Sequence, residues 1–100
     1  MQTPEGYEKA DIDKYLDTIG CWYCKPATFG FGKSGTPDRI GCMGGVFFSI
    51  EVKRPGKEPT PLQHRRMTEI MHNGGVAWWG TADKVIPEIK EFRRVQGYAD

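Results

Sequence analysis

The chain of 100 residues lacks the features that define several large classes of protein. No apolar run approaches the length of about 20 residues that spans a bilayer, which predicts that the protein has no membrane partner. The polar and acidic beginning, Met1 to Glu5, predicts no signal peptide and hence a cytoplasmic protein. Three cysteines are too few for a disulfide scaffold. Repeats and low-complexity tracts are also missing, so we expect a single domain over residues 1–100.

Two common ligand sites are each incomplete in the sequence. Cys21 and Cys24 have the spacing of a zinc-ligand pair, but a second pair with that spacing is missing. Gly32-Lys33-Ser34 resembles the end of a nucleotide-binding P-loop, but the first glycine of that pattern is missing. We therefore expect the cysteines to behave as small hydrophobic residues. We expect the glycine-rich loop, residues 28–37, to lie beside nucleic acid with Lys33 on a phosphate.

The net charge of +1 conceals a strongly basic segment. Between Lys53 and Arg66 the only acid is Glu58, and the segment contains Lys53, Arg54, Lys57, His64, Arg65 and Arg66. A phosphate backbone is attracted to such a local patch whatever the total charge. The segment is therefore a candidate nucleic-acid surface, and a solvated charged face is the alternative interpretation.

Apolar spacing and turn residues predict the element order α-β-β-β-α-β-α, which is an α/β fold with a mixed sheet flanked by helices. The first two expected helices cover residues 5–19 and 60–72. The expected strands cover residues 21–24, 38–42, 46–53 and 76–79.

Helix starts can be located from their capping residues. Thr60, Pro61 and Gln63 open the second helix as N-cap, first helical residue and capping-box partner. The last helix is expected to be capped by Asp83, because Pro87 is tolerated only in the first turn of a helix.

In the strand over residues 46–53, successive side chains point to opposite faces of the sheet. Every second residue from Val46 to Val52 is apolar and predicts a buried face, whereas Glu51 and Lys53 are neighbours on the other face. Placing an acid and a base there carries a desolvation cost. A salt bridge or a metal site would account for it.

Asp38 begins the preceding strand. If the two strands pair through a turn at residues 43–45, Asp38 lies opposite Ile50 or Glu51. Two carboxylates in one place suit Mg²⁺ or Mn²⁺. A nearby lysine, Lys53, can orient an attacking water and stabilise charge that develops on phosphorus oxygens.

Three motifs resemble the VRR-NUC family of PD-(D/E)XK nucleases, in particular its short stand-alone members from bacteriophages and bacteria. They are Gly35-Thr36-Pro37-Asp38, Ile50-Glu51-Val52-Lys53-Arg54-Pro55-Gly56 and Thr60-Pro61-Leu62-Gln63. The resemblance covers residues 3–84 and implies a restriction-endonuclease-like fold in a phage-encoded or bacterial protein. The chain departs from the family at Val76-Ala77-Trp78-Trp79, where a Val-Arg-Arg-like stretch gives the family its name.

The resemblance also implies a metal shell. Asp38 and Glu51 match the family's metal ligands, and the carbonyl of Val52 is the expected third oxygen. A glutamate of the first helix completes the shell in the family. Both Glu5 and Glu8 are candidates for it here, and Glu5 is slightly favoured.

With Lys53 as the catalytic lysine and Gln63 holding the site or its water, the resemblance implies a Mg²⁺- or Mn²⁺-dependent DNA endonuclease. The stand-alone members resemble homodimers that cut branched DNA such as Holliday junctions, and we expect the same here. The alternatives are an endonuclease or nickase of ordinary duplex and a non-catalytic binding module of a phage replication complex. The side chains expected to follow the DNA backbone are Lys33, Arg54, Lys57, Arg65 and Arg66.

Overall fold

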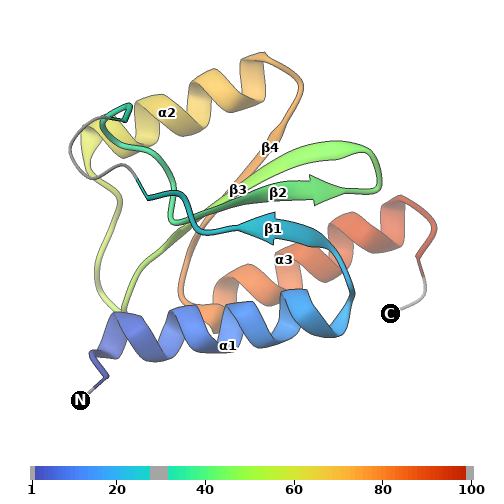
Figure 1. Cartoon of the computed structure of the whole chain (residues 1–100), viewed down its shortest axis with the longest axis horizontal. Coiled ribbons are helices and arrows are strands. Elements are labelled where there is room, and N and C mark those ends of the chain that lie inside the picture. The colour runs from blue at the N-terminus through green and yellow to red at the C-terminus, as the bar shows by residue number, and fades with distance from the viewer. Residues whose placement is uncertain (1, 28–31, 99–100) are drawn as a thin grey trace.

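The computed structural model describes residues 2–27 and 32–98, which form three helices and a four-stranded sheet (Figure 1). The elements in chain order are α1 Pro4–Thr18, β1 Trp22–Cys24, β2 Arg39–Met43, β3 Val46–Val52, α2 Pro61–His72, β4 Val76–Gly80 and α3 Ala82–Val95. The predicted element order and the mixed α/β class are therefore confirmed. Residues 28–31, part of the expected glycine-rich loop, lie outside the described residues.

The strands lie in the order β1-β2-β3-β4, antiparallel except for the parallel pair β3 and β4. A two-residue turn joins β2 to β3, with Gly44 at φ 58° and Gly45 at φ 82°. Glycine adopts such positive values without strain, and two of them in succession suit the twist of a hairpin. The register pairs Arg39 with Ile50. It therefore places Asp38, one residue before β2 and not within it as expected, level with Glu51.

Helices α1 and α3 cover one face of the sheet, and α2 covers part of the other (Figure 1). The alternation predicted for β3 decides which side chains meet which helices. Phe48, Ile50 and Val52 enter the core between the sheet and α1 and α3. Ser49 and Glu51 point to the α2 side and are also buried. None of the helices in residues 2–27 and 32–98 is long and apolar enough to cross a membrane.

The first two helices start where side chains satisfy their free N–H groups. The Thr3 hydroxyl accepts a hydrogen bond from the Gly6 N–H at 3.0 Å. At α2 the capping box is confirmed, because the Gln63 N–H donates to the Thr60 hydroxyl at 3.2 Å and the Gln63 side-chain oxygen accepts from the Thr60 N–H at 2.9 Å. Each such cap contributes about 1 kcal/mol to helix stability.

The predicted start of α3 is wrong. Its N-cap is Thr81, and Pro87 lies in the second turn of the helix. Proline there removes one hydrogen bond, to the Asp83 carbonyl, but Asp83 is exposed, so water can satisfy that carbonyl. The cap itself comes from another helix: the Glu8 carboxylate accepts a hydrogen bond from the Ala82 N–H at 2.8 Å.

Candidate active site

Asp38 and Glu51 meet where β3 ends, as the register requires. The Asp38 Oδ2 atom accepts a hydrogen bond from the backbone N–H of Val52 at 2.8 Å. This bond ties the segment before β2 to the end of β3 and brings the Asp38 carboxylate within hydrogen-bonding reach of Glu51. The Val52 N–H thus positions Asp38, and the role that the resemblance implies for the Val52 carbonyl stays a prediction.

Glu51 is buried, with 4% of its surface exposed. Loss of hydration, together with the hydrogen bond and negative charge of Asp38, raises the pKa of Glu51 to about 8. Lys53 opposes this shift from a distance of 3.8 Å between its Nζ and the Glu51 Oε2. The Lys53 backbone is fixed by a 2.9 Å hydrogen bond from its N–H to the Gly80 carbonyl. The Lys53 backbone is therefore held beside β4, next to Glu51.

A buried glutamate with a raised pKa costs stability wherever it is ionised. The cost is absent below the ordinary pKa, grows as the pH rises, and is complete above the folded-state value of about 8. We expect Glu51→Gln to stabilise the metal-free protein at pH 7 to 9 by at least about 1 kcal/mol, the equivalent of one pKa unit.

Melting temperatures in EDTA from pH 4 to pH 9 test this expectation. The gap between Glu51→Gln and wild type should widen as the pH rises, whereas the exposed Glu58→Gln serves as a control without such a gap. If the difference in melting temperature between Glu51→Gln and wild type does not change with pH, the ionisation of Glu51 does not cause that difference.

Glu5 and Glu8 of α1 have different partners. Glu5 acts on Glu51, whereas Glu8 contacts the start of α3. The negative charge of Glu5 contributes to the raised pKa of Glu51. The Glu5 side chain therefore lies on the face of α1 that is turned toward Asp38 and Glu51. Glu8 is engaged with the Ala82 N–H at the start of α3. Of the two candidates left open by the sequence, Glu5 is the one that the structure places beside the other carboxylates.

Glu5 is held by a lysine that the sequence did not single out. The Nζ of Lys9 lies 3.3 Å from the Glu5 Oε2 and 3.5 Å from the Asp38 Oδ1. Lys9 therefore bridges α1 and the segment before β2. The spacing of four residues between Glu5 and Lys9 was the available signal, because residues so spaced are neighbours on a helix.

The carboxylates fit a divalent cation in charge and in donor type. Ionising Glu51 beside Asp38 is unfavourable, a cost that a bound cation relieves, and the oxygens of both residues are the donors that Mg²⁺ and Mn²⁺ prefer. In residues 2–27 and 32–98, however, no group of three or more His, Cys, Asp or Glu side chains is assembled that could hold a metal ion. The Glu5 carboxylate instead contacts the Lys9 ammonium group at 3.3 Å.

A buried ion pair sets the position of Asp38. The Arg39 guanidinium donates to both Asp13 oxygens, at 2.7 Å and 3.0 Å, and to the Asp38 carbonyl at 2.8 Å. Burial alone would raise the pKa of Asp13, but the hydrogen bonds and charges of Arg39 and Lys25 lower it below its usual value. Arg39 thus locks α1 against β2 at the residue next to Asp38.

Two basic hollows flank the carboxylates. One, of about 490 Å³, is lined by Glu5 and Lys53 together with Arg54 and Lys57. Its lining comes from the beginning of α1 and from the segment after β3. The other, of about 290 Å³, is lined by Asp38 together with Lys9, Lys25 and Lys33. Of the predicted backbone contacts, Arg54, Lys57 and Lys33 are therefore next to the site.

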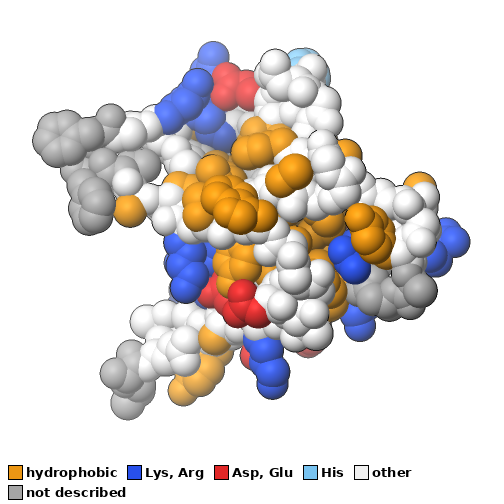
Figure 2. Space-filling model, turned by 45° about the vertical axis from the view of Figure 1, so that its right-hand side comes forward, with side chains coloured by type: hydrophobic (Ala, Val, Ile, Leu, Met, Phe, Trp, Pro, Cys, Tyr) orange, Lys and Arg blue, Asp and Glu red, His pale blue; other side chains and the backbone are white. Residues whose placement is uncertain are grey.

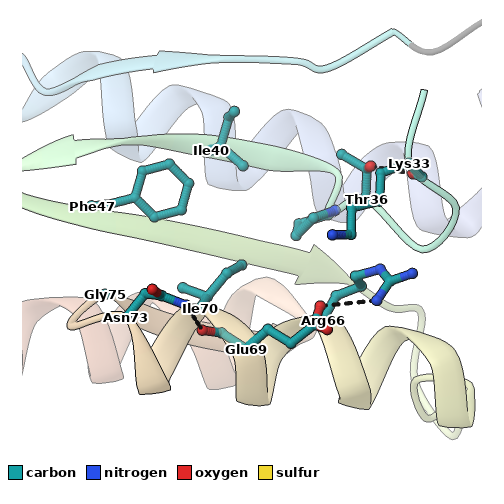
Figure 3. A pocket seen from close by; sticks show the side chains of 10 residues that line it. Lys33, Thr36, Ile40, Phe47, Arg66, Glu69, Ile70, Asn73 and Gly75 are labelled. Carbon is teal, nitrogen blue, oxygen red and sulfur yellow. Dashed lines mark hydrogen bonds and ion pairs between the residues drawn. The ribbon is translucent and has the colours of Figure 1, made fainter.

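Arg66 has a different environment from the other predicted contacts. Its Nε donates to the Ser34 carbonyl at 2.8 Å, and its guanidinium pairs with Glu69 at 2.9 Å. Figure 3 shows this pair on α2, at the edge of a more apolar hollow whose strand side carries Ile40 and Phe47. Arg66 thus fixes the loop before Asp38 onto α2, whereas Arg65 is exposed on the same helix.

No family model, curated protein or solved structure matches the chain. The resemblance to VRR-NUC nucleases therefore rests on the motif residues. The function that those residues suggest has to be argued from the geometry of the site.

Proposed function

We propose that the protein is a metal-dependent nuclease that hydrolyses phosphodiester bonds in DNA at the site formed by Asp38, Glu51 and Lys53. The observation that carries this proposal is the meeting of two carboxylates and a lysine at the end of β3, with Glu51 buried. Asp38 raises the cost of ionising the buried Glu51, and a carboxyl group shifted in this way is typical of functional sites.

Asp38 and Glu51 would hold the cation, with Glu5 as the third side chain. A bound Mg²⁺ or Mn²⁺ would supply Lewis-acid polarisation of the phosphate and an acidified water. Lys53 contributes an ammonium group that stabilises negative charge developing on the phosphoryl oxygens. Asp38 is kept in place for this task by the Val52 N–H and by Arg39. Gln63 supports the site indirectly, because its side chain fixes the start of α2.

The basic hollows would receive the DNA backbone on either side of the scissile phosphate. Arg54 and Lys57 line one hollow, and Lys25 and Lys33 line the other. Such contacts give salt-dependent affinity with little reading of base sequence. The resemblance to stand-alone VRR-NUC nucleases implies branched DNA, such as a four-way junction, and we propose this as the preferred substrate.

A homodimer would place two such sites on one junction. Exposed hydrophobic side chains gather on one face of the molecule (Figure 2). On the half of the sheet that α2 leaves open, Trp22 lies opposite Cys42, and Cys42 lies opposite Phe47. Trp22 is 67% exposed and Phe47 is 44% exposed. An apolar row of this kind on a sheet face fits an interface with a second copy of the chain.

We expect Trp22→Glu to convert a dimer into a monomer, because a charge placed in an apolar interface has no partner there. Light scattering coupled to gel filtration gives the mass of wild type and variant at equal concentration. Val95→Glu, at another exposed apolar residue on α3, is the matched control and should leave the mass unchanged. A monomeric wild type would contradict the proposed dimer.

The proposed function is tested by cleavage of a labelled four-way junction, a flap and a plain duplex, each with Mg²⁺, Mn²⁺ or EDTA. We expect metal-dependent, symmetric cuts in the junction. Equal cleavage of the duplex would favour a duplex endonuclease or nickase at the same site. If no substrate is cut with either metal, the chain is a binding module and the proposal is wrong.

A further inference from the structure

Lys9 occupies a position between two carboxylates of the proposed metal site. Its ammonium group contacts the Glu5 Oε2 at 3.3 Å and the Asp38 Oδ1 at 3.5 Å. The Lys9 side chain is 32% exposed and the Asp38 side chain is 23% exposed, so the contact is partly shielded from water. A charge contact in such a place is screened less by salt than one on the open surface.

Lys9 supplies the positive charge that the Glu5 and Asp38 carboxylates share. Both of these carboxylates act on Glu51, and Lys53 lies 3.8 Å from Glu51. Without the Lys9 charge, Glu5 and Asp38 would lose the ammonium group that both contact. The Lys9 ammonium group therefore neutralises negative charge that a bound metal cation would otherwise neutralise.

Resting on the proposed function, we propose that Lys9 is the resident counter-ion of the metal-free site and that a divalent cation must displace it to bind. A cation held by Asp38 and Glu5 needs the oxygens that Lys9 now contacts. Glu5 must also release Lys9 to become the third ligand, because its Oε2 atom now contacts the Lys9 ammonium group. Lys9 thereby sets the metal affinity of the site.

The displaced ammonium group has a defined place to go. Lys9 lines the hollow that also carries Lys25 and Lys33, beside Asp38. A lysine released into this hollow strengthens its positive charge at the moment when the site is loaded. Metal binding would therefore favour binding of a substrate phosphate on this side of Asp38.

The test measures Mn²⁺ binding without DNA, by the electron paramagnetic resonance signal of the free ion. Charges at such distances alter a neighbouring equilibrium by at least about tenfold. We expect Lys9→Met to bind Mn²⁺ about tenfold more tightly than wild type. Lys9→Arg, which keeps the charge, should stay near the wild-type affinity. Lys14→Met, which removes an exposed lysine of the same helix, is the matched control and should leave the affinity unchanged.

Thermal melting supplies a second readout. Without metal, Lys9→Met should melt at a lower temperature than wild type, because its carboxylates repel one another. With saturating Mn²⁺ it should show the larger gain in melting temperature. If wild type binds Mn²⁺ and Lys9→Met binds it equally or more weakly, the role of Lys9 is refuted while the metal site stands. If neither protein binds Mn²⁺, the proposed metal site fails, and the role of Lys9 fails with it.

Discussion

Lys53→Met is expected to lower the rate of DNA cleavage at saturating metal and DNA by about 10²- to 10³-fold. This is the range found when one group that stabilises transition-state charge is removed from an active site. The Lys53 ammonium group lies 3.8 Å from Glu51, and its side chain is only 14% exposed, so few other cations can take its place. Single-turnover cleavage of a labelled junction gives the rate.

Lys57→Met is the matched control for this prediction. Lys57 lines the same hollow as Lys53 but is exposed and lies farther along the loop. Its loss should weaken DNA binding and reduce the dependence of affinity on salt, without changing the rate at saturation. If both variants slow the saturated rate equally, Lys53 acts only as a backbone contact.

Asp13→Asn is expected to destabilise the fold by about 1.5 to 3 kcal/mol, the range for hydrogen bonds to a charged group, because the Asp13–Arg39 pair is partly buried. Arg39 is 6% exposed and would keep its charge with one donor group facing an amide. This loss is a large fraction of the total stability of a typical domain. Urea unfolding at pH 7 measures it. Asp11→Asn, at an exposed position of the same helix, should change stability far less.

The same pair gives a pH dependence with a definite sign. Because the pKa of Asp13 is lowered in the folded protein, its contribution is complete above the ordinary aspartate value and is lost as the pH falls through the folded-state value. The stability difference between wild type and Asp13→Asn should therefore shrink in acid. A difference that stays constant from pH 7 to pH 2 would mean that Asp13 does not act through its charge.

The parts of the site that could be predicted depend on local rules. Alternation along β3 and the expected turn at residues 43–45 narrowed the partner of Asp38 to Ile50 or Glu51, and the register selects Glu51. The capping box at Thr60 and Gln63 was predicted for the same reason, since its two partners are three residues apart. Both results follow from geometry within one or two neighbouring elements.

The parts that were missed depend on contacts between distant segments. Arg39 meets Asp13 across 26 residues, and the Glu8 cap of α3 spans 74 residues. Asp83 was predicted as the cap because Pro87 was expected in the first turn, and the contact of Glu8 at the start of α3 could not be read from the sequence. Lys9 could be paired with Glu5 by helical spacing, but its contact with Asp38 depends on how α1 packs against the sheet.

Arg39 also changes the interpretation of the Asp38 motif. Arg39 was not singled out from the sequence. In the fold its guanidinium binds the Asp38 carbonyl, so the same ion pair that stabilises the domain also orients a proposed metal ligand. Partial loss of this pair should therefore affect the proposed activity before it unfolds the protein.

The most direct test of the proposed metal centre compares DNA cleavage and DNA binding by wild type and Glu51→Gln, with Mg²⁺ and with EDTA. Because Glu51→Gln is expected to be the more stable protein, lost activity cannot be ascribed to unfolding. The account predicts that wild type cuts a four-way junction only with Mg²⁺, and that Glu51→Gln binds the same junction without cutting it. Cleavage by wild type in EDTA, or full activity of Glu51→Gln, would contradict it.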